Sequence, residues 1–197
     1  MIIYICRVNW RLQDMQKKNL SINCIIAIDP GASNGGICVF RPKETPKCVR
    51  MPKDLRDLRD FIAYYKEFTN PIVFVEKLNV RVDDAEENRG KLFRIQTMLA
   101  NFEQIKAVLT LLDVPYCLVH PMKWQSRLNL RKVGRYEEKS ERKKRYKEVA
   151  QDLYKGVKVT LWNADALLIM HFGRVVLSND LNWLLENIPR NTHNKLF

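Results

Sequence analysis

Three acidic residues of this chain each lie against an apolar stretch. Asp29 ends one apolar run and precedes a glycine-rich turn, Glu76 follows a second run, and Asp165 interrupts a third. A carboxylate beside a hydrophobic core is costly unless a cation or hydrogen bonds compensate it. Mg²⁺ prefers carboxylate oxygens, and a pair of such ions activates water and stabilises the leaving oxygen of a phosphodiester. The three acids therefore predict metal-dependent chemistry on a phosphate polymer.

Each acid also has an ordinary explanation when it is considered alone. The Asp-Pro-Gly that begins at Asp29 is a common turn, and Glu76 is followed by Lys77, which allows a simple ion pair at a strand end. Asp165 is harder to explain, because a lone buried carboxylate costs several kcal/mol unless it is paired. The combination of all three is more specific than any one of them.

The composition points to an acidic partner. The chain has 197 residues, of which 46% are hydrophobic, and a formal net charge of +12. This length and hydrophobic content fit one ordinary domain, and the excess of positive charge is typical of proteins that bind nucleic acid. Residues 121–150 hold 11 Lys or Arg against 4 Glu, interleaved with Trp124, Tyr136 and Tyr146. Basic residues mixed with aromatic ones favour a strand-tracking surface, although a solvated helix face is the simpler alternative.

The cysteines and histidines argue against a zinc site. The five cysteines form no C-x-x-C pair, and the chain has three histidines. A disulfide framework is not expected either, and Cys24, Cys38 and Cys117 are predicted to be core thiols. These features indicate a reducing, intracellular compartment. No stretch is long enough to span a bilayer, so a membrane partner is not expected.

The pattern of apolar residues predicts an α/β fold. We expect an N-terminal extension over 1–23, one domain over 24–178 and a C-terminal tail over 179–197. The predicted strands are 24–29, 36–41, 47–51, 72–75 and 114–119, and the predicted helices are 52–69, 90–112, 121–128, 137–154 and 161–177. The first three strands form an antiparallel meander, and the other two follow helices, which predicts a mixed sheet with helices on both faces. A right-handed crossover would make the first and fourth strands neighbours, with Asp29 beside Glu76 and Asp165 closing the site.

Several blocks of the sequence resemble the RuvC-type Holliday junction resolvases. They are Asp29-Pro30-Gly31 with Gly35-Gly36, then Val75-Glu76, and then the segment 163–169. Residues 137–140 resemble the lysine-bearing segment of that family, and 120–125 resemble a block of its phage-type branch. The resemblance covers roughly Ile25 to Gly173. It implies an RNase H-like fold with a mixed five-stranded sheet, three strands antiparallel and two parallel, flanked by helices.

The resemblance also implies a function and a set of roles. The family nicks four-way DNA junctions symmetrically, as homodimers that use Mg²⁺ or Mn²⁺ and no small-molecule cofactor. By this resemblance Asp29, Glu76 and Asp165 would bind metal, and Lys139 would contact the scissile phosphate. Other basic residues are expected to contact DNA: Arg81, Arg89, Lys123, Arg131, Lys132, Arg135, Lys143 and Lys147. The last two share a helix face, for which a solvated surface is an equal alternative. The helix 90–112 is a candidate dimer face, and Phe93 within it is expected in the core.

The sequence departs from the family at one position. A second Asp usually stands one turn before the final one, and here that position is Trp162. Asn163 is turned away from this position and is a poor substitute. Asp83 or Asp84 could supply the ligand instead. The departure leaves open a catalytically weakened, structure-selective DNA-binding protein. A separate alternative is an RNase H-like nuclease acting on structured RNA.

Overall fold

The computed structural model describes residues 22–31, 35–78, 89–131 and 137–188, and its centre is one five-stranded sheet. The strands are β1 (Cys24–Asp29), β2 (Gly36–Phe40), β3 (Lys47–Arg50), β4 (Pro71–Glu76) and β5 (Tyr116–Val119). Their order is β3-β2-β1-β4-β5. The pairs β1–β2 and β2–β3 are antiparallel, whereas β1–β4 and β4–β5 are parallel. This arrangement confirms the predicted mixed sheet.

The two central strands are apolar along their length because helices cover both faces of the sheet. In β1, Ile25 and Ala27 pack under one helical layer, whereas Ile26 and Ile28 pack under the other. A strand that is buried on both faces does not alternate polar and apolar residues, so its sequence is an unbroken apolar run. The helices are α2 (Leu55–Phe68), α3 (Arg89–Leu111), α4 (Pro121–Arg127), α5 (Lys139–Leu153), α6 (Ala164–Asn179) and α7 (Leu181–Asn187).

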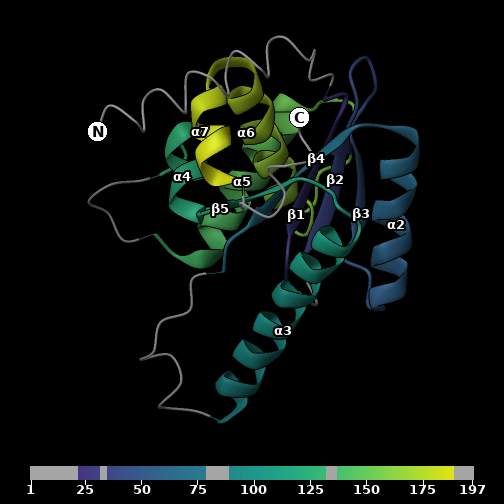
Figure 1. The fold of residues 1–197 in the computed structure, drawn as a ribbon. Helices are drawn as coiled ribbons and strands as arrows, with labels where there is room; N and C mark the ends of the chain where they lie inside the picture. Colours follow the sequence, from purple (N-terminus) through teal and green to yellow (C-terminus); the bar gives the residue numbers. More distant parts are fainter. Residues whose placement is uncertain (1–21, 32–34, 79–88, 132–136, 189–197) are drawn as a thin grey trace, which may run out of the picture.

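Helix α6 is the centre of one layer. It packs on β1, β2 and β4 and is contacted by α4, α5 and α7, while α2 and α3 lie on the opposite face of the sheet (Figure 1). The ring of Phe74 on β4 lies so near Gly173 that a Cβ at Gly173 would be 2.7 Å from Cε2 of that ring. A glycine at this position therefore lets α6 approach the sheet closely.

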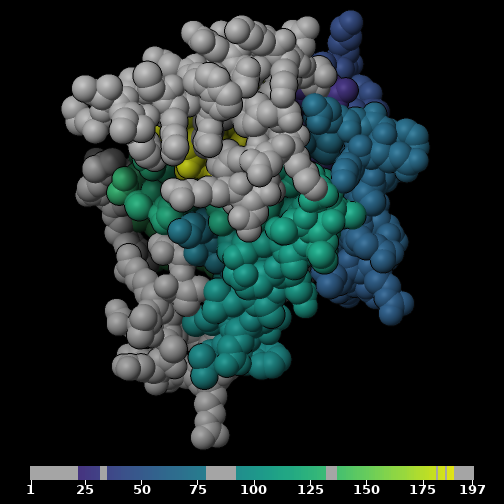
Figure 2. All heavy atoms as spheres, in the orientation of Figure 1, coloured from purple at the N-terminus to yellow at the C-terminus, as the bar shows by residue number. Residues whose placement is uncertain are grey.

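Helix α3 extends past the sheet, and this corrects one expectation. Its second half carries the buried Phe102, Ile105 and Leu109. In its first half, Phe93 is 70% exposed, so the prediction of a core position is wrong. The surface of α3 is visible in the lower part of the space-filling view (Figure 2). Helical spacing alone could not reveal the error, because the periodicity continues beyond the end of the sheet.

The C-terminal part also differs from expectation. Residues 179–197, predicted as a tail, include α7, whose Leu184 is fully buried. Trp183 packs edge-on against Phe172 of α6, with ring centroids 5.1 Å apart. The short helix thus adds to the α6 layer, and residues 189–197 lie outside the described residues.

Two cysteines form a cross-strand disulfide. Cys38 and Cys48 are register partners on β2 and β3 and are linked through their sulfurs, so the prediction of a free thiol at Cys38 is wrong. Cys24 and Cys117 are buried free thiols, as predicted. The disulfide fastens the edge strand β3 to the rest of the sheet. Among the described residues, no helix is both long and apolar enough to cross a bilayer.

Candidate active site

Two of the predicted acids end neighbouring parallel strands. Ile28 of β1 is in register with Val75 of β4, so the next residues, Asp29 and Glu76, stand beside each other at the carboxyl edge. Side chains alternate along a strand, and the alternation directs both carboxylates to the face covered by α6. The expected neighbour relation of Asp29 and Glu76 is confirmed.

The third acid comes from the first turn of α6. Asp165 is 6% exposed, and α6 packs directly on β1. The turn before the helix is held by the side chain of Asn163, which is also buried. Its Oδ1 accepts from the Thr160 backbone at 2.7 Å, and its Nδ2 donates to the Lys158 carbonyl at 3.1 Å. Because of these hydrogen bonds, α6 begins at Ala164 and not at the predicted residue 161. The bonds also fix the position of Asp165.

The three carboxylates act on one another electrostatically. Burial, followed by the negative charge of Asp165, raises the pKa of Asp29 to about 6. Burial, followed by the charges of Asp29 and Asp165, raises the pKa of Glu76 to about 8. Like charges near each other in a partly dry setting favour the protonated forms. The site therefore has a deficit of positive charge that a bound cation would relieve.

Lys143 of α5 supplies one positive charge to this site. Its ammonium Nζ contacts Oδ2 of Asp165. Burial lowers the pKa of Lys143, but the Asp165 carboxylate, with Asp29 and Glu76 beyond it, outweighs that effect and raises the pKa. Lys139, predicted to act at the scissile phosphate, begins α5 one turn earlier and is exposed. The structure thus places Lys143, and not Lys139, against the acids.

Trp124 of α4 holds Glu76. Its indole Nε1 donates a hydrogen bond of 3.0 Å to Oε1 of Glu76, and its ring packs edge-on against Tyr146 of α5, with centroids 5.3 Å apart. Both aromatic residues are buried, so the interpretation of Trp124 and Tyr146 as parts of a strand-tracking surface is wrong. Residues 120–125 are singled out in the sequence by their resemblance to the phage-type block. No pattern in these residues indicates a hydrogen bond to Glu76.

The turn after Asp29 is built from backbone contacts. The Gly31 amide donates to Oδ1 of Asp29 at 3.3 Å, and the Gly35 amide donates to the Gly31 carbonyl at 2.7 Å. A Cβ at Gly35 would lie 2.3 Å from the Asp29 carbonyl oxygen, which no side chain tolerates. Asn101 of α3 donates to the Pro30 carbonyl at 2.6 Å. The turn is thereby fastened to α3, and Asp29 with it.

The donor set suits a hard divalent cation. Carboxylates such as those of Asp29, Glu76 and Asp165 are the ligands that Mg²⁺ and Mn²⁺ prefer. Oδ1 of Asp165 is buried and has no hydrogen-bond partner in the described part of the chain. Their spacing is not that of a preformed metal centre, because within the described ranges no three His, Cys, Asp or Glu side chains group closely enough to share an ion. The Lys143 ammonium occupies part of this space against Asp165.

The position of the missing fourth acid is filled by an indole. Trp162 packs over Gly36, and the guanidinium of Arg50 lies 5.2 Å from its ring centroid. Asn163 cannot substitute as a ligand, because its side-chain oxygen is used by the 158–163 turn. Asp83 and Asp84 lie outside the described residues.

The predicted DNA-binding residues are only partly described. Lys123 on α4, Arg131 after it and Lys147 on α5 are exposed, and Lys143 faces the acids. Arg89 begins α3. Arg81, Lys132 and Arg135 lie outside the described residues.

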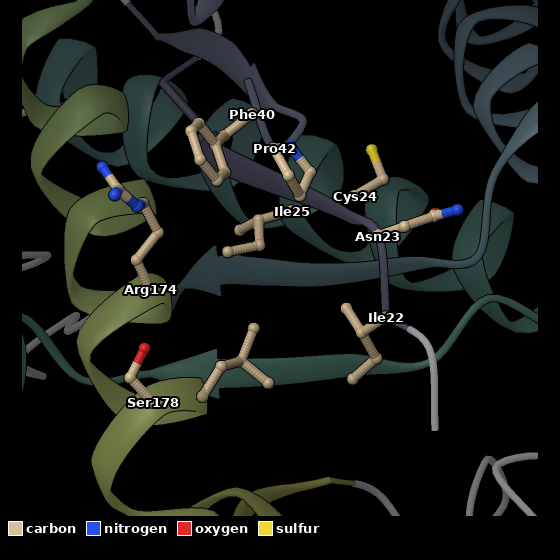
Figure 3. Close-up of a pocket in the computed structure, with 9 residues that line it drawn as sticks. Ile22, Asn23, Cys24, Ile25, Phe40, Pro42, Arg174 and Ser178 are labelled. Carbon is tan, nitrogen blue, oxygen red and sulfur yellow. The ribbon is translucent and has the colours of Figure 1, made fainter. Parts of the chain in front are cut away.

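A separate cavity of about 260 Å³ lies at the other end of β1 (Figure 3). Arg174 is the cation in its wall, and its guanidinium lies 4.3 Å from the Phe40 ring centroid and donates to the Tyr154 hydroxyl at 3.3 Å. Other lining residues are Ile22, Asn23, Cys24, Ile25, Pro42, Leu177 and Ser178. This cavity is not part of the acid site.

Comparison with known proteins supports the fold. No protein-family model matches the chain, and no curated protein matches it. The structure of Thermus thermophilus RuvC in complex with a Holliday junction substrate is similar at 15% identity and a TM-score of 0.50, over 80% of this chain and 96% of that chain. A further Thermus thermophilus RuvC structure has 14% identity and a TM-score of 0.48, over 84% and 98% of the two chains. The first of these two structures confirms the expected RNase H-like fold, a mixed five-stranded sheet flanked by helices.

Proposed function

We propose that this chain is a metal-dependent endonuclease that nicks four-way DNA junctions in recombination or phage DNA processing. The observation that carries the proposal is that Asp29 and Glu76 end adjacent parallel strands of a RuvC-like sheet, on the face covered by the helix that holds Asp165 and its partner Lys143. The net charge of +12 suits a nucleic-acid substrate.

Each residue has a defined role in this proposal. Asp29, Glu76 and Asp165 would hold Mg²⁺ or Mn²⁺, which when bound polarises the phosphodiester and lowers the pKa of water. Trp124 orients the Glu76 carboxylate through its N–H donor. Lys143 places a fixed positive charge beside the acids, where the negative charge of a reacting phosphate would grow.

The substrate and assembly follow from symmetry and surface chemistry. A junction has two equivalent strands to cut, which a twofold dimer matches. The first half of α3 offers a face for the partner copy, because Leu92, Phe93 and Leu99 are exposed there. Exposed Lys123, Arg131 and Lys147 would contact the DNA backbone. The cytoplasm of a bacterial or phage-infected cell is the proposed location because the RuvC-type resemblance implies it; the Cys38–Cys48 disulfide removes the support that the cysteines were expected to give.

A second candidate is junction binding without cleavage. Two observations favour it: Trp162 occupies the position of a ligand acid, and the described carboxylates are not spaced as a ready metal centre. The two candidates differ in the fate of the DNA and not in its binding.

A cleavage assay separates these candidates. Synthetic four-way junction, linear duplex and structured RNA would be incubated with the protein and Mg²⁺ or Mn²⁺. The proposal predicts paired nicks in the junction that disappear in Asp29→Asn and persist in Asp57→Asn, a matched change in the first turn of α2. Binding without nicks supports the second candidate, and preferential cleavage of RNA would replace DNA as the substrate.

A further inference from the structure

Arg50 and Asp29 belong to one row of residues across the sheet. Arg50 at the end of β3 is in register with Gly36 of β2, which is in register with Asp29 of β1. Register partners in an antiparallel pair project to the same face, here the α6 face. Two strand spacings separate Arg50 from Asp29, roughly 10 Å.

Trp162 lies over the middle of this row. A Cβ at Gly36 would stand 2.9 Å from Cε3 and 3.0 Å from Cζ3 of the Trp162 ring, so the glycine makes room for the indole between Asp29 and Arg50. Trp162 lies three residues before Asp165, in the turn that leads into α6, and is partly exposed. An aromatic face is therefore held beside the acids, at the position where a second Asp was expected.

Within the described residues, no acid neutralises the charge of Arg50. Arg41 and Arg145 are bound to Glu44 and Glu137, whereas Arg50 forms no ion pair with any described residue. Its observed partner is the Trp162 ring, at 5.2 Å from the centroid. Because Arg50 is exposed, its N–H donors remain open to solvent or to a ligand. A guanidinium stacked on an aromatic ring is pre-oriented without losing these donors.

We propose that Arg50 and Trp162 form a nucleotide-binding subsite for the DNA strand beside the cleavage position. Arg50 binds a backbone phosphate through its planar fork of donors, and the indole stacks on an adjacent unpaired base. The inference rests on the proposed function and adds to it. In this chain Trp162 stands where a metal ligand was expected, and it contacts the substrate instead.

Equilibrium binding in EDTA tests the subsite without cleavage. Fluorescence anisotropy would follow a labelled four-way junction at several salt concentrations. We expect Trp162→Ala to weaken binding about 5- to 100-fold through lost stacking. Arg50→Gln should weaken binding and lower the slope of log K against log salt by about 0.9, as for one lost phosphate contact. Arg56→Gln removes the same charge from α2 on the opposite face and should change neither binding nor slope.

Two further variants keep the test independent of folding damage. Trp162→Phe retains a stacking ring and should bind more tightly than Trp162→Ala. Gly36→Ala would displace the indole through its new Cβ, and combined with Trp162→Ala it should cost no more than Trp162→Ala alone. Thermal unfolding of each variant verifies that the comparison is made on folded protein.

The outcomes distinguish this inference from the proposed function. Wild-type affinity and salt slope in Arg50→Gln and Trp162→Ala, together with normal junction cleavage, would overturn the subsite and leave the nuclease proposal standing. If the wild type neither binds nor cleaves any nucleic acid, both proposals are overturned. Loss of affinity in both variants but not in Arg56→Gln supports the subsite even if the protein nicks nothing.

Discussion

The indole N–H of Trp124 donates to Oε1 of Glu76 at 3.0 Å, which joins a buried ring of α4 to a carboxylate at the end of β4. Tyr146 of α5 packs on the same indole, and Lys143 stands one helical turn before Tyr146 and contacts Asp165. Helix α5 therefore supports two of the three acids, one through Trp124 and one directly.

Removing this hydrogen bond should weaken metal use. Trp124→Phe keeps most of the ring but loses the donor, so Glu76 is free to rotate. We expect the Mn²⁺ concentration for half-maximal junction cleavage to rise about 10- to 100-fold, as for other residues that orient metal ligands. Trp183→Phe, a matched change beside Phe172 of α6, should leave it unchanged. An unaltered metal requirement in Trp124→Phe would contradict the assigned role.

Lys139 and Lys143 of α5 should differ sharply in their contribution to the cleavage rate. Lys143 contacts Asp165, whereas Lys139 is exposed at the helix start. We expect Lys143→Ala to lower the single-turnover cleavage rate about 100-fold or more, because a fixed charge at the reacting phosphate is lost. Lys139→Ala should change the rate by less than about 5-fold, the size of a surface phosphate contact. Single-turnover measurements on one junction decide between them, and the reverse order would restore Lys139 to the predicted role.

The sheet and its acids were predictable because they depend on local patterns. Apolar runs define β1 and β4, and the β-α-β crossover makes them parallel neighbours. Once the two strands are in register, Asp29 and Glu76 must meet at one edge. Asp165 stands out as a carboxylate in an apolar helix, which required no knowledge of its surroundings.

Other features depended on tertiary contacts that no local pattern contains. Lys139 and Lys143 share a helix face, and only the docking of α5 on α6 decides which one reaches Asp165. Trp124 lies among exposed basic residues, and its burial follows from packing against Tyr146. Phe93 has helical periodicity, but the sheet ends before it.

The stability of the metal-free protein should fall with rising pH. Glu76 has a pKa of about 8 in the folded state against an ordinary value of 4.5, and Asp29 about 6 against 3.8. Between the ordinary and the folded-state pKa of each carboxyl group, the folded protein binds more protons than the unfolded chain. Deprotonation in this pH range therefore favours unfolding. Melting temperatures in EDTA should decrease from about pH 5 to about pH 8.

Glu76→Gln should flatten this dependence. The amide carries no charge, so the variant should melt above the wild type near pH 8 in EDTA. Glu67→Gln, an exposed change on α2, should keep the wild-type pH profile. A Glu76→Gln protein that melts below the wild type at this pH would show that burial of the charge is not what limits stability.

The close approach of α6 to the sheet gives a prediction on stability alone. A Cβ at Gly173 would lie 2.7 and 2.8 Å from Phe74 ring atoms, and Phe74 is fully buried on a central strand, so neither side can yield easily. Overpacking of this kind costs about 1–3 kcal/mol, and the better helix propensity of alanine recovers about 1 kcal/mol. Because the overlap is severe, we expect Gly173→Ala to lower the free energy of unfolding by about 1–2 kcal/mol. Gly156→Ala, whose Cβ would meet Thr45 at an ordinary 3.6 Å, should be neutral or slightly stabilising. Urea unfolding of the two variants tests the pair, and equal stabilities would mean that α6 does not press on Phe74.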